Sequence, residues 1–179
     1  MKRISILIIA IILISCTSQG LSEFCGTWVR DVADSELGID GIECISIHED
    51  SSVVIVNKMT MIYVDSVLKS EVNFTTSIGG LWQYSEDNID INLNVKTYKF
   101  TIDSTKTSVT AVGKGNVISD EAAKHLLADL SVALSDFYKC VYVESPQLSI
   151  NDVSLLRDGR LMGNYGESSI LWHKVYSHN

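Results

Sequence analysis

Four histidines and four cysteines are the side chains of this sequence best suited to metal or nucleophile chemistry. The histidines lie far apart, and no two have the spacing of metal ligands on one helix. They are His48, His125, His173 and His178. His48-Glu49-Asp50 could hold a cation through neighbouring oxygens, but a turn rich in acidic residues is more often only solvated. We therefore expect no metal site and no cofactor.

Nucleophilic catalysis needs a Ser or Cys activated by a His, and the usual local signature is Gly-x-Ser-x-Gly. The sequence lacks this signature. Gly113-Lys114-Gly115-Asn116 does not have the spacing of a phosphate-binding loop. Carboxylates are abundant, yet their separation cannot be read from a sequence, so a glycosidase-like pair stays open. Because no catalytic motif is present, we expect a protein that is not an enzyme.

Three of the cysteines, Cys25, Cys44 and Cys140, form neither a Cys-x-x-Cys pair nor a cluster of metal-like spacing. In an oxidising compartment three thiols allow one disulfide, with one cysteine left over. One structural bridge and three buried thiols both fit the spacing. The disulfide pairing therefore stays open.

The fourth cysteine, Cys16, follows a segment with the composition of a targeting signal. Basic residues in Met1-Lys2-Arg3 precede an apolar run from Ile4 to Ile14. A spanning helix needs about 20 apolar residues, so this run is too short to cross a bilayer. Leu13-Ile14-Ser15-Cys16 resembles the lipobox of bacterial lipoproteins. The resemblance implies cleavage before Cys16, diacylglycerol on its thiol, and acylation of the freed amine, typically with palmitate.

These features divide the chain into three parts. Residues 1–15 are expected to be a signal peptide, residues 16–22 a lipidated cysteine with a polar tether, and residues 23–179 a single domain. The lipoprotein resemblance, without an acidic sorting residue after Cys16, implies an outer-membrane anchor that faces the periplasm. The formal charge is −8 and no basic cluster is present, so nucleic acid is a poor partner. The membrane contact is expected through lipid on Cys16, and the sequence identifies no protein partner.

Most of the domain alternates apolar and polar residues with period two, which predicts antiparallel strands with one buried face. The clearest stretches are 71–78, 88–96 and 98–103. Further strands are expected at 27–31, 42–48, 53–64, 81–84, 108–112, 141–144 and 170–176. Gly79-Gly80 is expected to form a turn, and Asp158-Gly159 suits a two-residue type I′ hairpin. This spacing of short strands favours a meander, a sandwich or a barrel.

One segment, from Asp120 to Phe137, has helical spacing instead. Its predicted apolar face consists of Ala123, Leu126, Leu127, Leu130, Ala133, Leu134 and Phe137. Ser119 is the expected N-cap, and the acidic residues after it suit the positive end of the helix dipole. The polar face carries a single Lys, so we expect the helix to pack on the sheet rather than lie on a membrane.

The domain opens with Gly26-Thr27-Trp28, which resembles the Gly-x-Trp motif of lipocalins and of bacterial lipocalin-like lipoproteins. The resemblance implies a barrel in which Gly26 bends the chain and Trp28 closes one end. It covers the order of elements over most of residues 23–176. The family's second motif is not found, and no basic residue can be assigned to pack over Trp28. About forty residues follow Phe137, more than the one short strand usual in the family.

Aromatic residues on the predicted strands supply the candidate ligand contacts. Eight-stranded barrels are either filled by side chains or hold one small ligand. The first hypothesis is a lipocalin-like module that binds a small apolar ligand through Phe74, Trp82, Tyr98 and Phe100. The alternative is an envelope interaction or structural lipoprotein, with a filled core and no ligand cavity. A cavity of roughly 300 Å³ or more favours the first.

Overall fold

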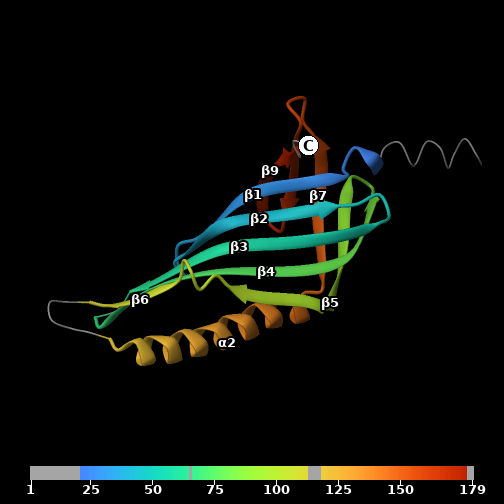
Figure 1. Cartoon of the computed structure of the whole chain (residues 1–179). Helices are drawn as coiled ribbons and strands as arrows, with labels where there is room; N and C mark the ends of the chain where they lie inside the picture. Colours follow the sequence, from blue (N-terminus) through green and yellow to red (C-terminus); the bar gives the residue numbers. More distant parts are fainter. Residues whose placement is uncertain (1–20, 65, 113–117, 177–179) are drawn as a thin grey trace, which may run out of the picture.

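The structure is a computed structural model that describes residues 21–64, 66–112 and 118–176. Most of these residues lie in strands or in one long helix (Figure 1). The predicted signal segment and Cys16 lie outside the described residues. The elements are β1 (Gly26–Asp34), β2 (Ile39–Ile47), β3 (Ser52–Val64), β4 (Leu68–Ser85), β5 (Asn88–Ile102), β6 (Ser108–Ala111), α2 (Asp120–Glu144), β7 (Gln147–Leu155), β8 (Arg160–Tyr165) and β9 (Ser168–Val175).

The strands form a closed antiparallel barrel. Strands β1 to β5 pair in chain order, β5 then pairs with β7, and β9 returns to pair with β1. The short strand β6 stands outside this ring and pairs with the first residues of β4. The ring therefore has eight strands. This confirms the predicted mainly β barrel with one long amphipathic helix.

Strand β4 is continuous where the sequence predicted a turn. It runs through Gly79-Gly80, and its register with β5 shifts between Ser77 and Gly79. A Cβ atom on Gly80 would lie 2.4 Å from the carbonyl oxygen of Asn92, so a side chain there would force the two strands apart. The glycine pair thus permits close strand packing at an irregularity instead of ending the strand. The turn expected at this position is wrong.

The two-residue turn with type I′ geometry lies between β4 and β5, not at Asp158-Gly159. Glu86 and Asp87, between β4 and β5, both have positive φ, at 50° and 64°, as a type I′ turn requires. In Asp158-Gly159 only the glycine has positive φ, at 81°, and its N–H donates to the carbonyl of Leu156 at 2.9 Å. That loop is longer than two residues, so the type I′ turn predicted there is wrong.

Helix α2 begins where it was predicted and ends later. The Ser119 side chain accepts a hydrogen bond from the Ala122 N–H at 3.2 Å, as an N-cap does. The helix then continues to Glu144, so the strand expected at residues 141–144 is wrong. Tyr142 lies four residues after Tyr138 and therefore stays on the inner side of the helix, where it is buried.

The buried face of α2 is narrower than the predicted one. Leu134 is buried, and Leu127, Leu130 and Tyr138 pack with it against the sheet. Phe137 is 50% exposed, so its assignment to the buried face is wrong. Figure 1 shows the helix lying along β5 and β6. Within the described residues, no helix has the length and apolarity needed to cross a bilayer.

One end of the barrel is closed by Trp28. Its ring is 1% exposed, and its indole N–H donates to the carbonyl of Phe24 at 2.7 Å. The ammonium of Lys174 lies 5.0 Å from the centre of the Trp28 ring, which supplies the basic partner that the sequence did not reveal. Gly26 has φ +134°, and a Cβ there would lie 2.7 Å from the Lys174 side chain. Glycine therefore allows the chain to bend beneath Lys174.

Candidate functional site

A cavity of about 400 Å³ lies inside the barrel. Its walls are the inward-facing residues of β1, β2 and β3, the last turns of α2, and side chains of β5, β7, β8 and β9. Ile45, Ile55, Met59 and Ile150 give it an apolar interior. Towards Trp28 the side chains of Ile47 and Leu161 leave no room for a water molecule, so the cavity ends above the closed end.

The opening of the cavity is rimmed by exposed apolar side chains. Leu37 follows β1, Phe137 and Val141 come from α2, and Tyr165 ends β8. Their exposed fractions are 52%, 50%, 44% and 44% in that order. Large apolar groups gathered at the mouth of a cavity are typical of a site for an apolar ligand.

Polar residues occupy one level of the barrel wall. Asn57 pairs with Thr76 on one side and with Glu43 on the other, and Glu43 pairs with Arg30. These four residues stand on the consecutive strands β1 to β4 at matching positions and face inward. We call them the polar layer. On β9, Trp172 lies one residue beyond His173, the last residue paired with β1, and so comes opposite Arg30. The Arg30 guanidinium carbon lies 5.7 Å from the centre of the Trp172 ring.

The polar layer is hydrogen-bonded within itself and to the helix. Arg30 Nε donates to Glu43 Oε1 at 2.5 Å. Asn57 Nδ2 donates to the Tyr142 hydroxyl at 2.8 Å and to Thr76 Oγ1 at 3.3 Å. Burial raises the pKa of Tyr142, so its hydroxyl stays protonated at neutral pH. The side chains of Arg30 and Glu43 are 22% and 17% exposed, so solvent still screens their ion pair.

Two residues that line the cavity each have a buried polar atom with no hydrogen-bond partner among the described residues. These atoms are Asn57 Oδ1 and Trp172 Nε1, in residues that are 6% and 2% exposed. An unpaired buried polar atom costs about 1–3 kcal/mol. Both atoms are themselves inaccessible to water, so they do not form part of the cavity surface.

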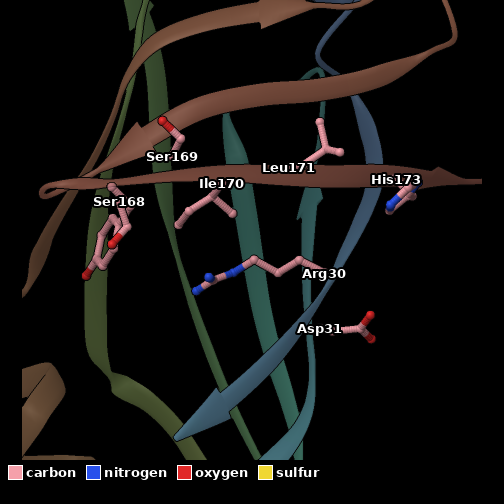
Figure 2. A pocket seen from close by; sticks show the side chains of 8 residues that line it. Arg30, Asp31, Ser168, Ser169, Ile170, Leu171 and His173 are labelled. Atoms are coloured by element: carbon pink, nitrogen blue, oxygen red, sulfur yellow. The ribbon is translucent and has the colours of Figure 1, made fainter.

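Few residue pairs join β1 to β9. Three residue pairs, from Thr27 with Val175 to Val29 with His173, join these strands. Beyond them a surface pocket of about 460 Å³ separates Arg30 and Asp31 from residues 168–171. Figure 2 shows Arg30 pointing away from Asp31, beneath the strand that carries Ile170. Arg30 and Tyr165 line both this pocket and the inner cavity, so the seam between β1 and β9 borders the inner cavity.

The four predicted ligand contacts lie around the cavity rather than on its described lining. Phe74 and Phe100 stack on each other, with ring centres 5.6 Å apart, and Phe74 also contacts Tyr138. The Tyr98 hydroxyl donates to the carbonyl of Ser135 at 3.1 Å, which ties α2 to β5. Trp82 donates to the carbonyl of His48 at 2.8 Å and lines a separate pocket near the closed end.

The polar layer could not be recognised from the sequence, although the strands carry a signal for it. On β1, β3 and β4 the polar residue of the layer has an apolar inward neighbour on each side, as in Ile55-Asn57-Met59. A single such interruption is common. The shared level of the four polar residues becomes visible only when the register of the strands is known.

The described cysteines and acidic groups suggest no reactive centre. Cys25, Cys44 and Cys140 are free thiols, and Cys140 is exposed. Burial raises the pKa of Cys25 and of Cys44, which disfavours the reactive thiolate. In the part of the chain that the structure describes, no group of three or more His, Cys, Asp or Glu side chains is placed to hold a metal ion.

Comparison with known proteins adds no assignment to this geometry. No protein-family model matches the chain, and no curated protein sequence matches it.

Proposed function

We propose that this protein is a lipid-anchored cell-envelope lipoprotein whose lipocalin-like barrel binds a small, mostly apolar molecule. The observation that carries the proposal is the cavity of about 400 Å³ with its rim of exposed apolar side chains. Ligand cavities commonly measure roughly 300–1,000 Å³, and they are mostly apolar with a few placed polar groups. A barrel with a filled core, the alternative function, would not need such a cavity.

The anchor in this proposal is lipid on Cys16, inferred from the lipobox-like segment before it. The described chain starts at Leu21, whose carbonyl accepts a hydrogen bond from the Phe24 N–H beside the closed end. Strand β1 then runs roughly 25 Å away from that end before it reaches Leu37 at the cavity rim. A short tether from Cys16 would thus hold the closed end near the membrane and leave the opening towards the periplasm.

One observation favours the alternative of an interaction protein. The tip of the β3–β4 hairpin exposes Ile62, Tyr63, Val64 and Val67, which are 43% to 59% exposed. An exposed apolar tip of this kind is typical of a contact surface for another protein. The tip adjoins the cavity rim at Gly38, whose carbonyl accepts a hydrogen bond from the Ile62 N–H at 2.9 Å. The four tip side chains do not line the cavity, so variants inside the cavity and variants at the tip can still distinguish the two functions.

The test is binding of the apolar dye N-phenylnaphthylamine to the full-length processed protein in phospholipid nanodiscs, with empty nanodiscs subtracted. Ile55→Phe places bulk inside the cavity, because Ile55 is 2% exposed and lines it. Val54→Phe adds the same ring at the next position, which faces outward and is 38% exposed. We expect weaker dye binding with Ile55→Phe alone. Equal binding by both variants, at similar melting temperatures, would contradict a ligand in this cavity.

A further inference from the structure

One carboxylate stands at the mouth of the barrel cavity. Asp34 is the last residue of β1, is exposed, and lines the cavity. Its Oδ1 atom accepts hydrogen bonds from the backbone N–H groups of Glu36 and Leu37, both at 3.0 Å. Leu37 belongs to the exposed apolar rim, so Asp34 lies at the opening of the cavity rather than deep in the barrel.

The turn after β1 uses the Asp34 side chain only as a hydrogen-bond acceptor. Asn supplies the same acceptor oxygen and suits such turns equally well. The second carboxylate oxygen, Oδ2, has no hydrogen bond or ion pair with any described residue. The turn therefore does not need the negative charge of Asp34, and this charge is free to act on a ligand.

Aromatic side chains gather at the same opening. Phe137 and Tyr138 both line the cavity, with ring centres 5.3 Å apart and ring planes at 88°. Burial is the largest cause that raises the pKa of Tyr138, and the negative charge of Asp34 adds to the rise, which places this carboxylate near the ring. Tyr165 adds a third ring, 44% exposed. The faces of aromatic rings attract cations, so the rings and the carboxylate favour the same kind of ligand group.

The charged residues of the lining also favour a cation over an anion. Among the described residues that line the cavity they are Arg30, Asp34 and Glu43. Arg30 and Glu43 are paired with each other, so the charge of Asp34 is the one left uncompensated. The formal charge of the whole chain is −8, and its long-range field acts in the same direction.

We infer that the ligand carries a cationic group, an amine or a quaternary ammonium, at the mouth of the cavity, with its apolar part inside the barrel. This inference rests on the proposed function, because it assigns the head group of the same ligand. The cation contacts the Asp34 carboxylate and the rings of Phe137 and Tyr138, and the apolar part lies against Ile55 and Met59. A cation at the opening keeps part of its hydration, which avoids the cost of burying an ion completely.

The test compares three amphiphiles with the same decyl chain on the full-length processed protein in phosphatidylcholine nanodiscs. Decyltrimethylammonium is positive, decyl sulfate is negative and decanol is neutral, and each is used below the concentration at which it forms micelles. Displacement of bound N-phenylnaphthylamine is the readout, and empty nanodiscs give the partition of each probe into lipid. We expect decyltrimethylammonium to displace the dye at a concentration about tenfold or more below that of decyl sulfate.

Two matched variants locate the effect. Asp34→Asn keeps the acceptor that the turn needs and removes the charge from the mouth. Asp31→Asn removes the same charge two residues earlier on β1, from a side chain that does not line this cavity. Only Asp34→Asn should weaken displacement by decyltrimethylammonium, by about fivefold, as expected for one exposed ion pair. Displacement by decanol should stay unchanged in both variants, and melting curves identify any loss that comes from unfolding.

The outcomes separate this inference from the proposed function. Equal displacement by decyltrimethylammonium and decyl sulfate, after correction for lipid, would overturn the inference while the dye still bound in the cavity. Equal losses in Asp34→Asn and Asp31→Asn would also overturn it, because the preference would then come from the overall charge of the chain. If the dye itself did not bind above empty nanodiscs, the proposed function would fail.

Discussion

At the scale of single residues, Trp28 combines burial with a specific hydrogen bond to Phe24. Truncation of a buried Trp costs about 3–5 kcal/mol, a large share of the roughly 5–15 kcal/mol that holds a domain folded. We therefore expect Trp28→Ala to lower the melting temperature and the folded yield strongly. Trp28→Phe should recover much of the loss, because it keeps most of the apolar volume and gives up mainly the indole bond.

Thermal melts of the three proteins check this prediction. Leu81→Ala offers a control, because Leu81 is 62% exposed and should cost little. A Trp28→Ala protein that melts like the wild type would mean that Trp28 does not close the barrel, and the lipocalin-like motif would lose its structural meaning.

Local motifs could be predicted from the sequence, whereas contacts that depend on strand pairing could not. Gly26-Thr27-Trp28 predicted the start of β1, because glycine followed by a large ring is a local pattern. Lys174 could not be assigned to Trp28, because the two residues meet only through the pairing of β9 with β1. Glu43 and Asn57 are ordinary polar residues in sequence, and their shared level appears only through the register across β2 and β3.

At the scale of elements, α2 depends on one narrow apolar stripe. Leu134 is buried against the sheet, and Val132, two residues earlier, is 62% exposed. Leu134→Asp should destabilise the protein by several kcal/mol, since it removes about 2–5 kcal/mol of packing and buries an unpaired charge. Val132→Asp should have little effect. Urea denaturation measures the free energy of unfolding of both variants. Equal losses of this free energy would show that the buried face of the helix is assigned wrongly.

Tyrosines at the contact between α2 and β5 make the folded protein sensitive to alkali. Burial raises the pKa of Tyr142, Tyr138 and Tyr98 in the folded state. As pH rises past about 10, the unfolded chain loses these protons first, so folding stability is full below that pH and declines above it. Tyr142→Phe should reduce the decline while it lowers stability at neutral pH through loss of the bond to Asn57.

Denaturation curves at neutral and at alkaline pH separate these two effects. Tyr63→Phe is a suitable control, because Tyr63 is 55% exposed at the hairpin tip. An identical alkaline decline in wild type and Tyr142→Phe would show that ionisation of Tyr142 does not limit stability.

The strands and the helix were predicted best where the pattern of apolar residues repeats over many positions. Fifteen residues of β5 alternate through much of their length, and α2 repeats its apolar residues over several turns. The end of α2 was missed because Val141-Tyr142-Val143 consists of β-branched and aromatic residues, which are typical of strands, and a run this short cannot distinguish the two periods. Gly79-Gly80 was read as a turn because the close approach of β5, which explains Gly80, is a contact between strands.

At the scale of the whole molecule, the proposed anchorage rests on one atom, the Cys16 thiol. Cys16→Ala should abolish lipid attachment and leave the signal uncut or the protein mislocalised, because the thiol is the proposed acylation site. Metabolic labelling with a fatty-acid analogue measures this directly. Cys140→Ala is the control, since Cys140 is also an exposed free thiol. Label retained in Cys16→Ala and lost in Cys140→Ala would refute the proposed anchor.

The pairing of β1 with β9 joins residues from nearly opposite ends of the chain, as in Thr27 with Val175. If the chain is exported from its N-terminus, β1 cannot pair with β9 until residues 168–175 have also crossed the membrane. During that interval the growing sheet has two unpaired edges, to which strands of other chains can add. Contacts so distant in sequence also form slowly, because a long loop must close first. In an exported chain, the arrival of β9 would therefore set the time at which exposure to aggregation and proteolysis ends.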